Sequence, residues 1–251
     1  MNKKSIVLAL AALVIGVTNA EARSQNPQEI CSSLIIEGGT ERERASVCDA
    51  ISFIMEKLEP YGVKYNWDQP IAKIQFHEKL DMPAILGFPD LKELLTQEEI
   101  DGVYGVNVGL YFPETREIHM LDFANFKKYE KPGKFTIDYK VWEAMLPYHE
   151  ISHYFIDMNN NDVAMLFFEE ALAYWMEISH MGIERAKEVK LYNPIAYDHT
   201  FMTEEHYKLA PFSFSILSWE VINGRPDYYI PGILNGDINL DYINYVRKRA
   251  E

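Results

Sequence analysis

The residues best suited to chemistry are His149, Glu150 and His153, which stand in the pattern H-E-x-x-H. On an α-helix, residues four apart lie on one face with their Cβ atoms about 5–6 Å apart. Two imidazoles in that arrangement can bind one metal ion at roughly 2.0–2.1 Å. The carboxylate beside the first histidine can take a proton from a water polarised by the metal. The spacing therefore predicts two metal ligands and a general base in one helical turn. The alternative is an ordinary helix that carries two unrelated histidines.

A second predicted helix offers a third ligand, because a catalytic zinc usually has three protein ligands and one open position. Residues 163–181 are apolar on nearly every side, which is typical of a buried helix, yet Glu169 and Glu170 lie in its middle. A buried carboxylate without a partner costs several kcal/mol, and a metal ion is one such partner. By spacing either glutamate can be the ligand, and the other then points to solvent.

The two segments together resemble a known family. H-E-I-S-H at 149–153 followed by F-F-E-E-A-L-A at 167–173 is similar to zinc metallopeptidases of the gluzincin type, especially the compact bacterial peptidase MA-like group. In that group the second helix carries a hydrophobic pair, a variable residue, and then E-G-L-A or a close variant. Aligned in this way, Glu170 takes the metal-ligand position and Glu169 the variable one. The resemblance covers about Val103 to Trp175.

The resemblance implies a secreted zinc metallopeptidase that acts on a peptide or protein substrate. One Zn²⁺ would be held by His149, His153 and Glu170. Glu150 would act as the general base and then pass the proton to the leaving amine. Asp157, one turn beyond His153, would either orient a ligand or end the helix. Four further side chains are candidates for stabilising the oxyanion: Tyr174, His199, His206 and Tyr207.

Two departures from the family pattern concern the backbone near the ligands. Ala171 replaces the usual glycine, and Pro147 lies two residues before His149. A proline inside a helix removes a backbone hydrogen bond, so the helix is expected to kink or to restart there. Asn160 and Asn161 lie where metallopeptidases with a third histidine would continue their motif, so that group is a poor match.

Two alternatives assign the same residues differently. Residues 150–153 and 177–180 are both E-x-x-H motifs, and di-iron carboxylate bundles use a pair of these with two further glutamates. That architecture needs four long helices, whereas strands are predicted where two of them should lie. The other alternative is a metallopeptidase fold kept as a non-catalytic binding module, which would retain the ligands and block the cleft.

The N-terminus predicts export. Lys3 and Lys4 precede an apolar run at 6–17 and an A-E-A site at 20–22, so residues 1–20 are predicted to be a signal peptide cleaved after residue 20 or 22. The run is short for a membrane span, so no stable membrane anchor is expected. Residues 21–251 are then expected to form a single metallopeptidase-like catalytic domain, secreted or periplasmic.

Charge and cysteine content limit the possible partners. The chain has 24 basic and 38 acidic residues, a net charge of −14, so we expect no nucleic-acid partner. The sequence gives no indication of the oligomeric state. In an exported chain, the only two cysteines, Cys31 and Cys48, favour a disulfide over two separate thiols.

The remaining patterns predict an α+β fold. Thr40 and Glu43 form a capping box before a helix that Pro60 and Gly62 end. A strand is expected at 71–76, and a hairpin of strands at 103–112 and 117–121. Asp138 or Thr136 opens the motif helix, and Asp162 caps the next. Other helices are expected at 91–100, 204–222 and 241–249. A small, mostly antiparallel sheet is therefore expected to pack on a helical metallopeptidase-like core.

Overall fold

The computed structural model describes residues 25–85, 108–130, 133–159, 166–192 and 211–235. These ranges contain the whole H-E-x-x-H motif and the helix that follows it from residue 166. Several sequence predictions lie outside the described residues: the signal peptide, the helices at 91–100 and 241–249, the N-cap at Asp162, and three candidate oxyanion donors, His199, His206 and Tyr207.

Local sequence explains where the first long helix begins and ends. Helix α3 (Glu41–Leu58) opens on a capping box, in which the Thr40 hydroxyl accepts from the Glu43 N–H and the Glu43 carboxylate accepts from the Thr40 N–H. A 3-10 turn at Glu59–Tyr61 follows, and Gly62 then takes a positive φ of 79°. The predicted capping box and helix end are confirmed.

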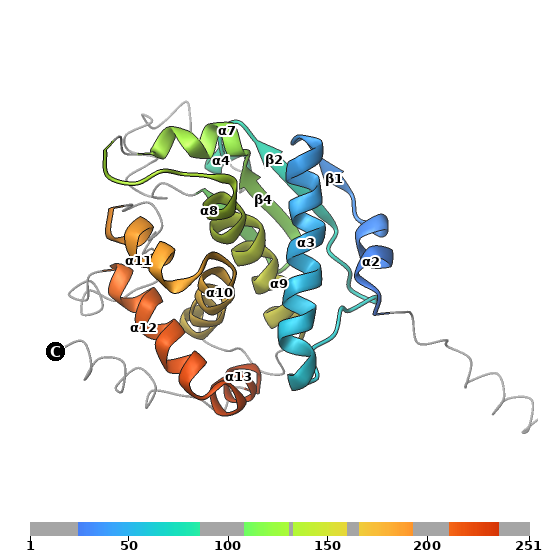
Figure 1. Ribbon diagram of the computed structural model, residues 1–251. Coiled ribbons are helices and arrows are strands. Elements are labelled where there is room, and N and C mark those ends of the chain that lie inside the picture. The colour runs from blue at the N-terminus through green and yellow to red at the C-terminus, as the bar shows by residue number, and fades with distance from the viewer. Residues whose placement is uncertain (1–24, 86–107, 131–132, 160–165, 193–210, 236–251) are drawn as a thin grey trace, which may run out of the picture.

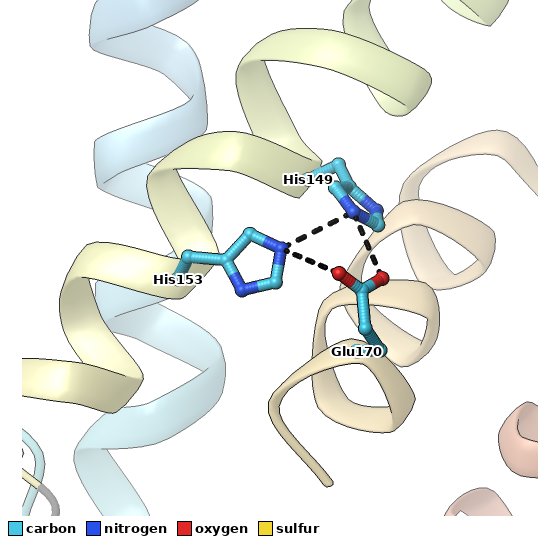
Figure 2. Close-up of side chains that lie close together, drawn as sticks. All are labelled: His149, His153 and Glu170. Carbon is cyan, nitrogen blue, oxygen red and sulfur yellow. Dashed lines mark hydrogen bonds and ion pairs between the residues drawn. The ribbon is translucent and has the colours of Figure 1, made fainter. Parts of the chain in front are cut away.

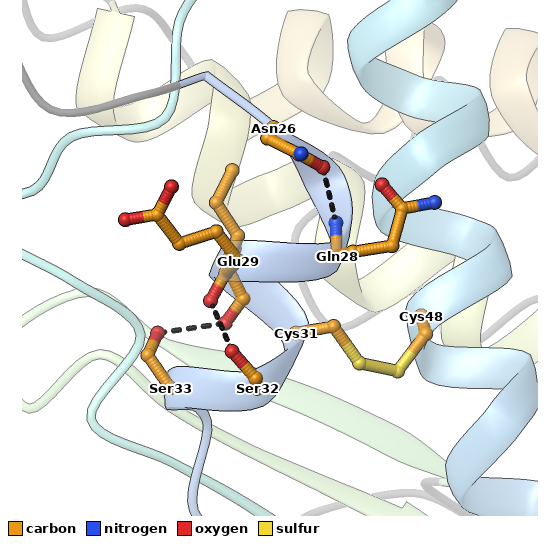
Figure 3. The surroundings of a disulfide bond; sticks show 8 residues. Asn26, Gln28, Glu29, Cys31, Ser32, Ser33 and Cys48 are labelled. Atoms are coloured by element: carbon orange, nitrogen blue, oxygen red, sulfur yellow. Dashed lines mark hydrogen bonds between the residues drawn. A yellow bond between two sulfur atoms is a disulfide. The ribbon is translucent and has the colours of Figure 1, made fainter.

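A disulfide fastens the N-terminal segment to this helix. Helix α2 (Pro27–Ser33) carries Cys31, and strand β1 (Ile36–Glu37) follows it. Cys31 is bonded to Cys48 of α3 (Figure 3), with the two Cα atoms 5.4 Å apart. The predicted disulfide is confirmed, and a loop of this length stabilises the fold by about 3 kcal/mol through the unfolded state.

The sheet has four strands in the order β1-β2-β4-β3. Strand β2 is Lys73–His77, β3 is Gly109–Phe112 and β4 is Glu117–Leu121. The predicted hairpin is confirmed, because β3 and β4 pair antiparallel. The prediction of a mostly antiparallel sheet is wrong for the described strands, since β1–β2 and β2–β4 are both parallel. The physical reason is that α3 returns the chain between β1 and β2, and a helical crossover joins parallel strands.

Helices form the rest of the described fold, so the α+β class is confirmed. Short turns of helix lie at α4 (Met82–Ile85), α7 (Phe123–Phe126) and η2 (Lys127–Tyr129). The longer run comprises α8 (Tyr139–Glu143), η3 (Ala144–Tyr148), α9 (His149–Asn159), α10 (Leu166–Met181), α11 (Ile183–Tyr192), α12 (Pro211–Gly224) and α13 (Pro226–Leu234). Among the described residues, no helix is long and apolar enough to cross a membrane.

The packing places α9 and α10 at the centre (Figure 1). Helix α9 contacts α3 and strand β3, α10 packs on α9, and α12 covers α10. On the sheet, Ile74 and Ile118 pair across β2 and β4 and are fully buried. The buried Trp142 of α8 donates its indole N–H to the Leu121 carbonyl at 3.0 Å, which ties the helices to the sheet. The motif helix is therefore held on several sides.

Candidate metal centre

Two neighbouring helices bring three predicted ligands together. His149 and His153 project from α9, and Glu170 projects from α10, with their polar atoms facing one another (Figure 2). The two Nε2 atoms of the histidines lie 3.3 Å apart. Glu170 Oε2 lies 3.4 Å from Nε2 of His149, and Oε1 lies 3.5 Å from Nε2 of His153. These three side chains form a group that could hold a metal ion.

The spacing of the donor atoms fits a bound metal. Ligands at roughly 2.0–2.1 Å in a tetrahedral arrangement lie about 3.3–3.4 Å from one another. The three contacts between the donor atoms, at 3.3, 3.4 and 3.5 Å, match that edge length closely. Two imidazole nitrogens and one carboxylate are also a common donor set for a catalytic zinc, with one position left open.

Access to the centre is uneven. The side chains of His149 and His153 are only 10% and 11% exposed, whereas that of Glu170 is 34% exposed. Solvent therefore reaches the group from the side of Glu170, and the two imidazoles form the buried wall.

The start of the motif helix explains how Pro147 is tolerated. Asp138, one of the two residues predicted to open the motif helix, caps α8 by accepting from the Val141 N–H. The chain then runs through a turn of π-helix, Ala144–Tyr148, that contains Pro147. The proline ring crowds the preceding turn of an α-helix, and the wider π turn gives it room. The backbone hydrogen bond that Pro147 cannot donate stays absent. His149, whose N–H reaches the Leu146 carbonyl, then starts α9.

Glu150 lies against strand β3. The residue is 7% exposed, and a Cβ placed on Gly109 would lie 2.8 Å from both its Cγ and Cδ atoms. Only a glycine at this position lets the strand approach so closely. Burial raises the pKa of Glu150 most, the positive charge of His149 lowers it, and the carboxylates of Glu170 and Glu177 raise it further, to about 8. A carboxyl with that pKa can hold or release a proton near neutral pH.

The two histidines have opposite proton affinities. Burial lowers the pKa of His149, but the carboxylates of Glu170 and Glu177 outweigh it and raise the pKa to about 10. Burial also lowers the pKa of His153. The carboxylate of Glu170 raises this pKa by less than burial lowers it, and the positive charge of His149 lowers it further, to about 4. His153 is therefore neutral and ready to act as a ligand, whereas His149 carries a proton that a metal must displace.

Sequence reasoning missed Glu177 as a partner of the ligands. Its side chain is 2% exposed, and Oε2 lies 3.4 Å from Nδ1 of His149. The available signal was its position seven residues after Glu170, because residues two helical turns apart lie on the same face. The sequence interpretation had used Glu177 only as part of a second E-x-x-H motif.

Of the other residues singled out in the sequence, Tyr174 lies beside a ligand, whereas Asp157 and His180 contact other side chains. Tyr174 packs its ring 5.1 Å from that of His149, so it is close to the group. Asp157 accepts from the Tyr111 hydroxyl at 2.7 Å, a bond between α9 and β3. The side chain of Glu169 lies outside the described residues. His180 faces Glu143 at 3.5 Å, so it does not join Glu177 in a second metal group among the described residues.

Comparisons with known proteins add a family but no function. No curated protein and no solved structure matches the chain. One family model matches residues 34–242, which includes the sheet, the metal centre and most of the helices. The chain therefore belongs to that family, a family of unknown function designated DUF6639.

Proposed function

We propose that this protein is an exported zinc metallopeptidase in which His149, His153 and Glu170 hold the metal and Glu150 is the general base. The observation that supports it most strongly is the set of three donor contacts, at 3.3, 3.4 and 3.5 Å, with Glu150 buried in the same helical turn. A zinc ion bound there would polarise a water molecule and the substrate carbonyl. The likeness to gluzincin-type enzymes at the two motifs supports the same assignment.

The roles of the chain's own residues follow from their surroundings. Glu150 would accept a proton at its carboxylate and deliver it to the leaving amine, because its pKa of about 8 lets it hold a proton near neutrality. Its burial beside Gly109 keeps bulk water away from that carboxylate. Tyr174 remains a candidate for donating a hydrogen bond to the oxyanion, since its ring lies beside His149.

Strand β3 supports a peptide as the substrate. It lies at the edge of the sheet, and among the described strands it pairs only with β4. The Leu121 N–H donates to the Val108 carbonyl, so in the antiparallel alternation the backbone groups of Gly109 point away from β4. An extended peptide could pair with those groups directly beside Glu150.

The disulfide supports the proposal that this protein is exported. The Cys31–Cys48 disulfide is the kind of bond that persists outside the cytosol. Together with the signal peptide predicted at residues 1–20, it supports a location in the periplasm or the medium. We propose no nucleic-acid partner, in keeping with the net charge of −14.

The test combines metal analysis with an activity screen. The chain lacking residues 1–20 should carry close to one zinc per molecule and cleave members of a diverse peptide library, with products read by mass spectrometry. Glu150→Gln should keep the zinc and lose activity by about 100-fold or more. Glu117→Gln is the matched control, because Glu117 also lies beside a histidine, His119, at 3.5 Å, but belongs to the sheet.

Three outcomes would count against the proposal. Full activity in Glu150→Gln would show that the base is another residue. A wild-type protein that takes up no zinc would refute the metal centre. Stoichiometric zinc without cleavage of any library member would favour the non-catalytic binding module, in which the same ligands hold a metal for structure.

A further inference from the structure

The ring of His149 lies between two carboxylates of the same helix. Glu170 faces its Nε2 atom at 3.4 Å, and Glu177 faces its Nδ1 atom at 3.4 Å. Both glutamates project from α10, two turns apart on one face. Glu177 differs from Glu170 in burial, because its side chain is 2% exposed against 34%. Each nitrogen atom of the His149 ring therefore faces a carboxylate from α10.

We infer that Glu177 is a positioning residue of the metal centre: its carboxylate accepts from Nδ1–H of His149 and so directs the Nε2 lone pair of that ring toward the metal. The inference rests on the proposed metal centre and extends it by one residue. A distance of 3.4 Å is long for a hydrogen bond, and such contacts commonly tighten when the site is filled.

The tautomer of His149 gives the physical reason. A neutral imidazole has one N–H and one lone pair, and only the nitrogen with the lone pair can bind a metal. A carboxylate beside Nδ1 favours the proton at Nδ1 and leaves Nε2 free for the ion. The same hydrogen bond prevents the ring from rotating and increases the basicity of the ligand.

The other histidine provides an internal contrast. Among the described residues, Nδ1 of His153 has no hydrogen-bond or ion-pair partner, and the contacts of this ring run through Nε2 and the ring of His149. Outside the ligand set, the orientation of His153 therefore depends on burial. Only His149 depends on a polar partner outside the ligand set, so Glu177 should influence that ligand selectively.

A purely structural role for Glu177 makes a different prediction. A buried ion pair that only joins α9 to α10 would affect folding stability and leave metal affinity unchanged in the folded protein. The chain offers a matched control in Glu143 of α8, which lies 3.5 Å from His180 of α10. That pair also joins α10 to a neighbouring segment through a glutamate and a histidine, and neither member is a ligand.

The experiment measures metal binding by the mature chain in competition with a chelator. Glu177→Gln should bind Zn²⁺ about 10- to 100-fold more weakly than the wild type, as expected for loss of a partner that orients a ligand. Glu143→Gln should bind within about twofold of the wild type. Cobalt-substituted protein provides a second readout, because its visible absorption spectrum should change in Glu177→Gln and not in Glu143→Gln. Glu177→Asp, which keeps the charge but withdraws the carboxylate, should give an intermediate affinity and serves if Glu177→Gln fails to fold.

The outcomes separate this inference from the proposed function. Wild-type affinity and an unchanged cobalt spectrum in folded Glu177→Gln would overturn the role of Glu177 and leave the peptidase proposal intact. A wild-type protein that binds metal but hydrolyses nothing would contradict the peptidase proposal. The positioning role of Glu177 would still be supported if the Glu177 variants bind the metal more weakly. A wild-type protein that binds neither metal would overturn both.

Discussion

His149 and His153 lie one turn apart on the same helix, yet their surroundings are opposite. His149 lies between the carboxylates of Glu170 and Glu177, and its pKa rises to about 10. His153 is buried and faces only one carboxylate among the described residues, that of Glu170, and its pKa falls to about 4. The H-E-x-x-H motif alone does not distinguish the two rings. Their difference comes from α10, so the electrostatics of this centre are set by the second helix.

The difference assigns separate tasks to the two rings. His153 is neutral at all ordinary pH values and offers a ligand that needs no deprotonation. His149 holds a proton when no metal is present, and that proton compensates part of the negative charge of Glu170 and Glu177. Metal binding must replace this proton. Since one positive charge takes the place of another, the two carboxylates are never left without a cation.

Removing each ring should therefore affect folding very differently, and this is the largest effect we expect. In protein kept metal-free with a chelator at neutral pH, His149→Ala removes the cation beside the buried Glu177 carboxylate, whereas His153→Ala removes a neutral ring. The two cavities are similar, so the difference in the free energy of unfolding isolates the charge and should be about 3 kcal/mol. Urea denaturation would measure it, and equal losses for the two variants would contradict the comparison.

Gly109→Ala should affect the general base, Glu150, without affecting metal binding by the two histidines. The added Cβ would meet the Glu150 side chain, so the carboxylate must shift by a fraction of an ångström or more. A displacement of that order at a catalytic group can reduce turnover roughly 100-fold, which is about 2.7 kcal/mol in the barrier. Neither ligand is touched, so zinc affinity should stay within about twofold. Loss of zinc together with activity would mean that β3 positions the ligands as well.

Much of this arrangement could be predicted from sequence, because the signals are local. The capping box at Thr40 and Glu43, the hairpin and the disulfide each depend on short patterns or on a pair of cysteines. The motif and Glu170 followed from ligand chemistry and a family resemblance. The parallel pairing of β1 was missed, because a strand of two residues carries almost no pattern. The opposite pKa values could not be predicted, since they depend on which carboxylates α10 turns toward each ring.

The pH dependence of metal binding should depend on His149 alone. Glu150→Gln is the suitable background, because it removes the carboxyl whose pKa is about 8. Below its raised pKa, His149 is protonated, so the apparent zinc affinity should rise about tenfold for each unit of pH from about 5 to about 8. His153 adds nothing in this range, because it has already lost its proton above about 4.

The slope of the logarithm of zinc affinity against pH distinguishes this assignment from a site with two ordinary histidines. Two rings with pKa values near 6.5 would give a slope that approaches about two at pH 5 and falls to about zero above pH 7. A constant slope of about one across the range supports the comparison, and competition with a chelator of known pH dependence would measure it. In Glu177→Gln the pKa of His149 should fall, because one of the charges that raises it is gone.

The smallest effect should come from the hydrogen bond between Tyr111 and Asp157, which lies one helical turn beyond His153. The Tyr111 hydroxyl donates to Asp157 at 2.7 Å and joins β3 to α9 one turn beyond that ligand. Tyr111→Phe removes the donor and should lower the free energy of unfolding by about 1 kcal/mol, the usual net contribution of one hydrogen bond, because both side chains are only partly buried. Zinc affinity should be unchanged, because the orientation of His153 depends on burial and not on this bond. The matched change at the other ring, Glu177→Gln, is expected to weaken zinc binding clearly. If Tyr111→Phe weakened zinc binding to the same degree, His153 would also depend on a polar contact, and the two rings would not differ in how they are held.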